Sequence, residues 1–326
     1  MKRLLPVATL HSLHARRFLL VVLLASACGR VERASVRDDA GRAVAVPKAI
    51  HRVVTLAPNL TEIVFAVGAG SRVVATDTFS DAPSAAKALP KVGGIPPNVE
   101  RIASARPDLV LALAAGGYAT YAAALSSLHI PLFVVRTERI ADVPRAMREI
   151  GRLLGAPEAE AAAAAVESGM ARQQRHRQRP PKVLFAIWTD PLYVAGRDTF
   201  GNDLLTLAGA QNAVQTSGWS QYSLESVVAN PPDLILYPDK SVKPAAVEAL
   251  LRAAPELRAR TTAVAVNENL FTRPSPRLVE AARSLNAILD AWEAGHRGSR
   301  LPIPNPRSPV YADERSAGRS SGAFLE

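Results

Sequence analysis

The chain has 326 residues, 48% of them hydrophobic, which is enough for two lobes with separate cores. The formal net charge of +10 would suit a nucleic-acid-binding protein, but residues 1–28 contribute +4 and residues 295–326 contribute +2, so only +4 belongs to the body. The basic run in the body, residues 172–182, contains no Phe, Tyr or Trp that could stack on bases, which argues against nucleic acid as a partner.

The N-terminal segment has the features of a secretory signal. Residues 1–17 are basic without any acid, residues 18–24 are apolar, and residues 25–27 are Ala-Ser-Ala. The apolar run is about half of the roughly 20 residues that a membrane-spanning helix needs. Cys28 follows directly, as the lipidated cysteine does in a lipoprotein signal. We expect residues 1–27 to be removed and Cys28 to anchor the protein to the outer face of the cytoplasmic membrane, with plain release into the periplasm as the alternative.

The first folded segment predicts an N-terminal α/β lobe over residues 51–139. Residues 28–50 before it are polar and irregular and predict a tether that ends in an edge strand. Apolar, β-branched runs predict strands over residues 52–56, 72–75, 109–113 and 131–135. Helical patterns cover residues 61–67, 98–105 and 120–128. Strands that alternate with helices indicate a parallel sheet.

The second half of the chain repeats this pattern after a helical connector. Residues 140–180 carry apolar residues at near-helical spacing and predict a long helix, or a helix pair broken near Gly155. Residues 181–294 predict a C-terminal α/β lobe, with strands over 182–187, 234–237 and 262–266 and helices over 202–207, 245–252 and 275–292. Pro, Gly, Ser and Arg dominate residues 295–326, which we expect to be a disordered tail.

An internal repeat relates the two α/β segments. The first copy reads NVERI over residues 98–102 and PDLVL over residues 107–111. The second copy reads SLESV over residues 223–227 and PDLIL over residues 232–236, an offset of 125 residues at every matched position. We therefore predict two Rossmann-like lobes joined by the helical connector, with a ligand cleft between them.

Loop residues near the expected strand ends suit a bulky, partly apolar ligand, because Trp and Tyr supply broad contact area at low entropic cost. The candidate ligand-binding residues are Phe79, Gly94, Ile95, Tyr118, Trp188, Tyr193, Trp219, Phe271 and Arg273. For each aromatic side chain, ordinary core packing is the alternative. Arg273 could meet anionic or amide groups of a ligand, or it could form a surface salt bridge.

Glu100 and Glu225 occupy the same position in the two copies of the repeat. Each carboxylate could simply complement the positive end of its helix, which contributes about 0.3–1 kcal/mol. A pair of carboxylates, one on each lobe, could instead bind arginines on the two halves of a symmetric membrane partner.

Six stretches of the sequence resemble the class III, helical-backbone substrate-binding proteins of ABC importers. They are TLAPNLTEIVFAVGAG (55–70), FSDAP (79–83), NVERIASARPDLVLA (98–112), PLYVAGRDTFGNDLL (191–205), WSQYSLESVVANPPDLIL (219–236) and FTRPSPR (271–277). The resemblance implies two α/β lobes bridged by a long helix. It also implies that Glu100 and Glu225 dock onto a permease dimer, which works with its ATPase. We expect the protein itself to be a monomer.

The resemblance further implies a metal-chelate ligand and no catalytic cofactor. A corrinoid of the vitamin B12 type is the first choice, and haem or a ferric siderophore is the alternative. Phe79, the loop at residues 94–96, Trp188, Trp219 and Arg273 would line the cleft. Members that bind vitamin B12 have a tryptophan where this chain has residues 93–97 and an aspartate where it has Asn269, so the ligand stays open.

Other classes of function find little support in the residues. The six histidines are scattered and lie outside the expected cleft loops, which argues against a bare metal ion as ligand. Residues 318–322 match G-x-S-x-G by letter, but no strand precedes them as a nucleophile elbow requires. We therefore do not expect an enzyme. A ligand-binding lipoprotein that serves a receptor or scavenges its ligand, without a transporter, is the remaining alternative.

Overall fold

The N-terminal lobe is built on a four-stranded parallel sheet. The computed structural model describes residues 33–297 of the chain. The strands lie in the order β4-β3-β5-β6, and neighbours pair in parallel. Their bounds are β3 (Val53–Thr55), β4 (Val73–Thr76), β5 (Leu109–Leu113) and β6 (Leu132–Val135). Nearly all of their side chains are buried, as expected for a parallel sheet covered on both faces. The predicted α/β layering is confirmed.

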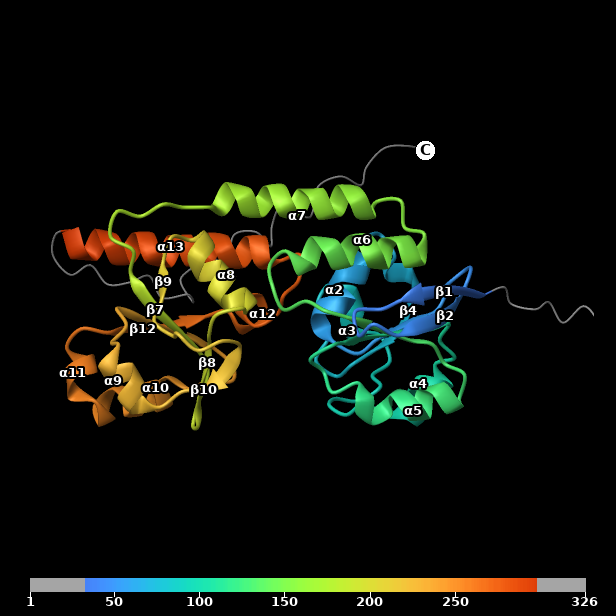
Figure 1. Cartoon of the computed structure of the whole chain (residues 1–326), viewed down its shortest axis with the longest axis horizontal. Coiled ribbons are helices and arrows are strands. Elements are labelled where there is room, and N and C mark those ends of the chain that lie inside the picture. Colours follow the sequence, from blue (N-terminus) through green and yellow to red (C-terminus); the bar gives the residue numbers. More distant parts are fainter. Residues whose placement is uncertain (1–32, 298–326) are drawn as a thin grey trace, which may run out of the picture.

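Helices lie on both faces of this sheet (Figure 1). On one side α2 (Pro58–Ala66) packs against α6 (Asp142–Leu154), and on the other side α4 (Val99–Ser104) packs against α5 (Ala119–Ser127). Two short elements flank β4, namely the 3₁₀ turn η1 (Gly70–Arg72) and α3 (Ser84–Lys87). The loops that follow the parallel strands meet at one edge of the sheet, where α/β folds present ligand sites.

A β-hairpin precedes this lobe, where the sequence predicted an irregular tether and a single edge strand. β1 (Arg33–Arg37) pairs antiparallel with β2 (Ala43–Pro47), and alternate valines of β2 are buried. Asp38 closes the turn by accepting hydrogen bonds from the backbone and guanidinium of Arg42. The prediction was incomplete because two short strands in a polar stretch give too weak an alternation to identify both.

The C-terminal lobe has a mixed sheet of six strands. Their bounds are β7 (Lys182–Thr189), β8 (Leu192–Ala195), β9 (Gln211–Asn212), β10 (Trp219–Gln221), β11 (Leu234–Pro238) and β12 (Thr262–Val266). The first half of β7 pairs in parallel with β9 and β11, and β11 pairs in parallel with β12. The second half of β7 forms a hairpin with β8, which pairs antiparallel with β10. This antiparallel end of the sheet was not predicted from the sequence.

The helices of this lobe also divide between two sides in Figure 1. α8 (Phe200–Leu207) lies next to α13 (Leu278–Arg297), and α12 (Glu268–Phe271) leads into α13. α9 (Leu224–Ala229), α10 (Pro244–Ala253) and α11 (Pro255–Arg258) lie on the opposite side. α13 extends to Arg297, five residues beyond the predicted end at Trp292.

The connector between the lobes is a helix pair, which was the second of the two predicted alternatives. α6 ends at Gly155, which adopts a left-handed conformation with φ of 58° that glycine accepts without strain. α7 (Ala159–Gln173) then runs back along α6 towards the C-terminal lobe, and α13 lies beside α7 (Figure 1). A Cβ atom on Gly151 would lie 2.0 Å from the Cβ of Ala159, so the two helices approach closely because glycine stands there.

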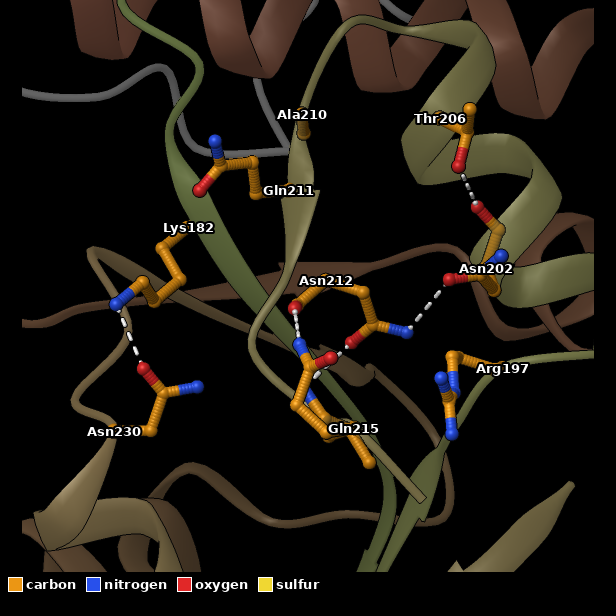
Figure 2. A pocket seen from close by; sticks show the side chains of 10 residues that line it. Lys182, Arg197, Asn202, Thr206, Ala210, Gln211, Asn212, Gln215 and Asn230 are labelled. Atoms are coloured by element: carbon orange, nitrogen blue, oxygen red, sulfur yellow. Dashed lines mark hydrogen bonds between the residues drawn. The ribbon is translucent and has the colours of Figure 1, made fainter. Parts of the chain in front are cut away.

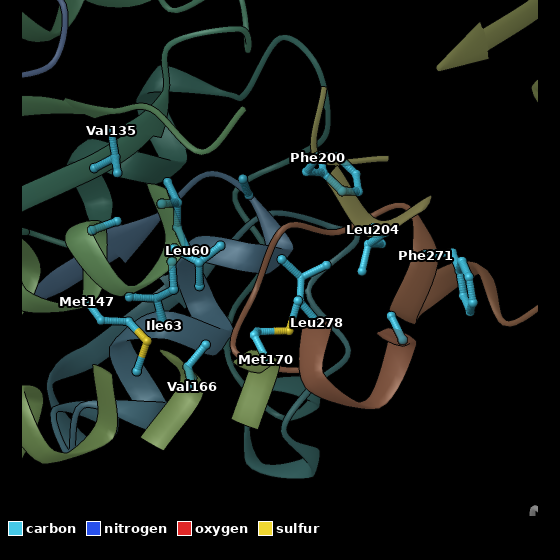
Figure 3. Close-up of a cluster of buried hydrophobic side chains, with 14 of the residues drawn as sticks. Leu60, Ile63, Val135, Met147, Val166, Met170, Phe200, Leu204, Phe271 and Leu278 are labelled. Carbon is cyan, nitrogen blue, oxygen red and sulfur yellow. The ribbon is translucent and has the colours of Figure 1, made fainter. Parts of the chain in front are cut away.

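One hydrophobic cluster runs through both lobes and the connecting helices (Figure 3). It joins Leu60 of the N-terminal lobe, Met147 of α6, Met170 of α7, Leu204 of α8 and Leu278 of α13, all of them buried. The lobes therefore share a core beneath the helical layer, and their relative position is set by packing as well as by the connector.

Candidate ligand-binding site

Exposed apolar side chains single out four of the predicted ligand-binding residues. Among the residues that the structure describes, the exposed large hydrophobic side chains are Phe79, Ile95, Leu128, Trp188 and Tyr193. All except Leu128 were predicted to bind ligand, and their exposed fractions run from 38% for Tyr193 to 79% for Ile95. Because burial would stabilise each of these side chains, their exposure in groups indicates a binding surface.

One group lies on two loops of the N-terminal lobe. Phe79 follows β4, and its ring lies against Gly94, where an added Cβ atom would be 3.4 Å from the ring. Gly93 has a φ of 105°, which glycine adopts readily, and a bridge to Pro97 folds its loop back on itself. Ile95 is at the tip of that loop. Phe79, Gly94 and Ile95 therefore lie close together.

The second group lies on the β7–β8 hairpin of the C-terminal lobe. Trp188 and Tyr193 are partners in the antiparallel register, so their side chains lie side by side on one face. The indole N–H of Trp188 donates a hydrogen bond of 2.8 Å to the carbonyl oxygen of Asp190, which fixes the orientation of the ring. The hairpin thus presents a fixed pair of aromatic side chains to solvent.

Three of the predicted ligand-binding residues pack against other side chains of the protein. Trp219 is partly buried, and its ring lies 6.2 Å from that of Phe185 and 5.2 Å from that of Phe200. Phe271 is 1% exposed and packs edge-on against Phe185, so the prediction that it lines the site is wrong for this arrangement of the protein. Tyr118 stacks under the guanidinium of Arg42, 5.0 Å from its ring centroid.

Arg273 forms a salt bridge, which was one of the two alternatives that the sequence suggested. Its Nη1 atom donates to Asp81 Oδ1 at 2.5 Å and lies 3.5 Å from Glu62 Oε1, and its Nη2 atom donates to the carbonyl oxygen of Phe79 at 3.3 Å. The side chain of Arg273 is 14% exposed and that of Asp81 is 38% exposed, so this is a partly buried ion pair between the two lobes. Arg277 next to it forms a bidentate pair with Glu62, with both N–O distances at 2.9 Å.

Two acidic residues of this site were missed by the sequence analysis. Asp77 is 2% exposed and accepts hydrogen bonds from the Phe79 N–H at 2.9 Å and from Ser80 Oγ. Burial raises the pKa of Asp77 above its ordinary value, against the opposing effect of these hydrogen bonds. For Asp81, burial alone would raise the pKa, but the hydrogen bond and charge of Arg273 outweigh it and the pKa is lowered. Their only sequence signal is the motif FSDAP and the aspartate before it.

Glu100 and Glu225 are both exposed in the first turn of α4 and of α9. The side chain of Asn98 caps α4 and that of Ser223 caps α9, in each case two residues before the glutamate. Hydrogen bonds from its own backbone N–H and from Ser223 lower the pKa of Glu225. Figure 1 shows α4 and α9 on the same side of the molecule, one on each lobe and opposite the layer of α6, α7 and α13. The two carboxylates are therefore accessible at equivalent positions.

A polar pocket of about 610 Å³ lies elsewhere, on the C-terminal lobe (Figure 2). Its amide side chains mostly bind one another and the backbone: Asn212 Nδ2 donates to Asn202 Oδ1 at 3.1 Å and to the carbonyl oxygen of Ala195 at 3.0 Å. Its lining includes none of the predicted ligand-binding residues. These amides therefore act chiefly in holding the edge of the sheet together.

Metal-binding clusters and membrane spans were also sought within residues 33–297. This part of the chain has no group of three or more His, Cys, Asp or Glu side chains placed to hold a metal ion. None of its helices combines the length and the apolar character that crossing a membrane requires. Cys28 and the expected tail lie outside the described residues, apart from the tail's first three residues, which continue α13.

Known proteins share this sequence and fold. Residues 53–275 match the family described as periplasmic binding protein. The vitamin B12-binding protein of Pectobacterium atrosepticum is 31% identical over 256 residues, which are 74% of this chain and 88% of that protein. A vitamin B12-binding protein of Yersinia pestis is 31% identical as well, over 73% of this chain and 86% of its own length.

Solved structures give the same result. A periplasmic heme-binding protein from Roseiflexus sp. RS-1 is similar with a TM-score of 0.66 at 29% identity, covering 72% of this chain and 96% of that one. A periplasmic heme-binding protein from Pseudomonas aeruginosa has a TM-score of 0.67 at 28% identity, covering 79% of this chain and 96% of that one. The resemblance read from the sequence is confirmed, and the chain belongs to the periplasmic binding protein family.

Proposed function

We propose that this protein binds a corrinoid of the vitamin B12 type outside the cytoplasm and delivers it to an ABC importer. The observation that carries the proposal is the pair of exposed apolar groups, Phe79 with Ile95 on one lobe and Trp188 with Tyr193 on the other. Apolar surface with a few fixed polar groups suits a large ligand that is itself partly apolar. The vitamin B12-binding relatives, 31% identical over about three quarters of the chain, support a corrinoid.

Haem is the second candidate, because the heme-binding structures are similar at 28–29% identity. A ferric siderophore is the third. Absorbance titration of the purified protein with cyanocobalamin, haemin and a ferric siderophore separates them, since each is a chromophore. We expect saturable binding of cyanocobalamin at one site. Binding of haemin alone would transfer the proposal to haem, and binding of none of the three would contradict it.

Delivery requires docking, which we assign to Glu100 and Glu225. Both carboxylates are exposed, occupy equivalent helix positions and lie on the same side of the two lobes. A permease dimer could meet them with one arginine on each half, through charge-assisted hydrogen bonds. The double variant Glu100→Ala/Glu225→Ala is expected to bind ligand normally and to lose complex formation with the reconstituted permease and ATPase. Retained docking would contradict the assignment.

The remaining parts of the proposal are that the protein is a monomer, performs no catalysis and is anchored through a lipid on Cys28. The family indicates an extracytoplasmic location, and the anchor is the finer claim. Replacement Cys28→Ser is expected to move the protein from the membrane fraction to the soluble fraction of the producing cells. An unchanged membrane fraction would contradict lipid anchoring without bearing on ligand binding.

A further inference from the structure

The loop that carries Phe79 is held on its inner side by the N-terminal lobe alone. Asp77 accepts the Phe79 N–H, and Lys91 Nζ donates to the carbonyl oxygen of Ser80 at 2.7 Å. Ser80 Oγ also bonds Thr61 Oγ1 at 2.7 Å inside the lobe. These contacts fix the backbone of the loop, and the carbonyl group of Phe79 and the carboxylate of Asp81 take no part in them.

The outer side of the same loop is held by the C-terminal lobe. Arg273 donates to both Asp81 and the carbonyl oxygen of Phe79, at 2.5 and 3.3 Å. Asn269 adds a hydrogen bond from Nδ2 to Asp81 Oδ2 at 3.0 Å. We call these three residues, Asp81, Arg273 and Asn269, the clasp. Asp81 is separated in the sequence from Asn269 by 188 positions and from Arg273 by 192.

We propose that Arg273 is a positioning residue, which sets the place of the Phe79 ring from the opposite lobe and does not itself touch the ligand. This inference rests on the proposed function, because it assigns a role within the same binding site. Both terminal nitrogens of Arg273 are already bonded, and its side chain is 14% exposed. In this geometry the guanidinium holds the loop that carries Phe79 from the C-terminal lobe, through both the Asp81 side chain and the Phe79 backbone.

The clasp also explains the amide at position 269. A carboxylate only accepts hydrogen bonds, so Asp81 needs the Nδ2 donor of Asn269 and the guanidinium of Arg273. Asn269 Nδ2 donates to Asp81 Oδ2 at 3.0 Å, so the amide presents its donor side to the carboxylate. An aspartate at this position would place two carboxylates together. Asn269 is thus matched to the clasp, and the binding surface on one lobe depends on the position of the other.

A double-mutant cycle tests whether Arg273 acts through Phe79. Affinity for cyanocobalamin, or for haemin if only haemin binds, is measured for Arg273→Gln, Phe79→Ala and the double variant. Each single change is expected to weaken binding about tenfold, and the double variant is expected to bind no more weakly than Phe79→Ala. If the affinity losses of the two single variants multiply to about a hundredfold in the double variant, Arg273 contacts the ligand directly and the proposal is overturned. An unchanged affinity in Arg273→Gln would overturn it too.

A second measurement needs no ligand. Amide hydrogen exchange of residues 78–81 is expected to rise at least several-fold in Arg273→Gln and in the near-isosteric Asp81→Asn, and to be partly restored in Arg273→Lys. Arg139→Gln is the matched control, because Arg139 forms another bidentate ion pair between the lobes, with Asp203, but does not contact this loop. Equal exchange in Arg139→Gln and Arg273→Gln would mean general loosening and would refute positioning. If the wild type binds none of the ligands, the proposed function fails while this measurement still decides the role of Arg273.

Discussion

At the scale of single residues, Trp188 is the side chain whose exposure is hardest to explain by stability. Trp188 is 48% exposed, yet the hydrogen bond to the carbonyl oxygen of Asp190 holds its ring in one orientation. A rigid aromatic side chain on a binding surface loses little entropy when ligand covers it. We expect Trp188→Ala to weaken ligand binding about tenfold or more, since truncation of such anchors commonly costs more than 1 kcal/mol.

The control for this prediction is Leu128→Ala. Leu128 is exposed to a similar extent, 50%, but was not predicted to bind ligand. Titration of both variants under the same conditions is expected to show normal affinity for Leu128→Ala. Equal losses in the two variants would mean that any exposed apolar side chain matters, and the assignment of the site would have no support.

The carboxyl group of Asp81 predicts a pH dependence of stability. Arg273 lowers its pKa in the folded protein, so the folded state holds the ionised form more tightly than the unfolded chain does. This contribution to the free energy of unfolding is present above the unfolded pKa of about 4 and is lost as the pH falls through the lower folded pKa. The difference in unfolding free energy between wild type and Asp81→Asn is therefore expected to be constant from pH 7 to about 5 and to shrink below about 4.

Urea unfolding at a series of pH values measures this difference. The pKa of Asp77 is raised by burial, so its titration acts in the opposite direction, but it is present in both proteins and cancels in the comparison. A difference that grows as the pH falls below 4 would mean that the pKa of Asp81 is raised, and the charge pairing in the clasp would be wrong.

At the scale of elements, the repeated Pro-Asp sequence has a structural role in both lobes. Asp108 Oδ2 accepts the backbone N–H groups of His51 and Arg52, at 2.8 and 2.9 Å, just before β3. In the other lobe Asp233 Oδ2 accepts the N–H of Lys182, the first residue of β7, at 2.8 Å. Each aspartate ties the start of its own strand to the start of the neighbouring parallel strand.

Removal of either carboxylate should therefore destabilise the fold. Asp108→Ala leaves two backbone donors without their partner, and we expect a loss of about 1–3 kcal/mol in the free energy of unfolding. Asp233→Ala is expected to cost less, because Asp233 Oδ2 accepts a hydrogen bond from one backbone N–H, that of Lys182. Asp108→Asn keeps an acceptor oxygen and is expected to retain part of the stability. Urea unfolding of the three variants would reveal the order, and a neutral Asp108→Ala would show that solvent replaces the carboxylate.

The elements that the sequence predicted correctly are those with local signals. β5 and β11 follow the same Pro-Asp start and consist of apolar runs, so their bounds match the prediction to within a residue. β8 and β10 are short, and their pairing depends on a hairpin that has no apolar alternation of its own. Parallel strands buried on both faces are thus easier to recognise than an antiparallel addition at the edge.

In the candidate site, too, the residues with a local sequence signal were easier to predict than those placed by tertiary packing. Phe79 and Trp188 stand at strand ends, where a loop aromatic side chain predicts ligand contact, and both are exposed. Phe271 stands in an equally suggestive loop sequence, but the packing of α12 against the sheet buries it. The clasp could not be predicted, because Asp81 and Arg273 meet through the relative position of two lobes and no local pattern encodes that position.

At the scale of the whole molecule, the shared core and the ion pairs between the lobes limit how far the lobes can move. Arg277 binds buried Glu62 with two bonds of 2.9 Å, and Arg139 binds Asp203 at 2.6 and 2.8 Å. Hinge motion would have to separate these ion pairs and would also open the hydrophobic cluster beneath the helices. The free energy needed to open these contacts would lower the affinity for the ligand.

We therefore expect ligand to bind with little closure. Small-angle scattering of the ligand-free and ligand-saturated protein should give radii of gyration that agree to within about 1 Å, as in other pre-organised complexes. The control is Arg139→Gln, which releases one of the ion pairs and leaves the clasp and the exposed aromatic groups in place. A large contraction of the wild type on binding would mean that the arrangement seen here is one end of a hinge motion. In that case the clasp would form in only one of the two states. Arg273 would then position the Phe79 loop in that state alone.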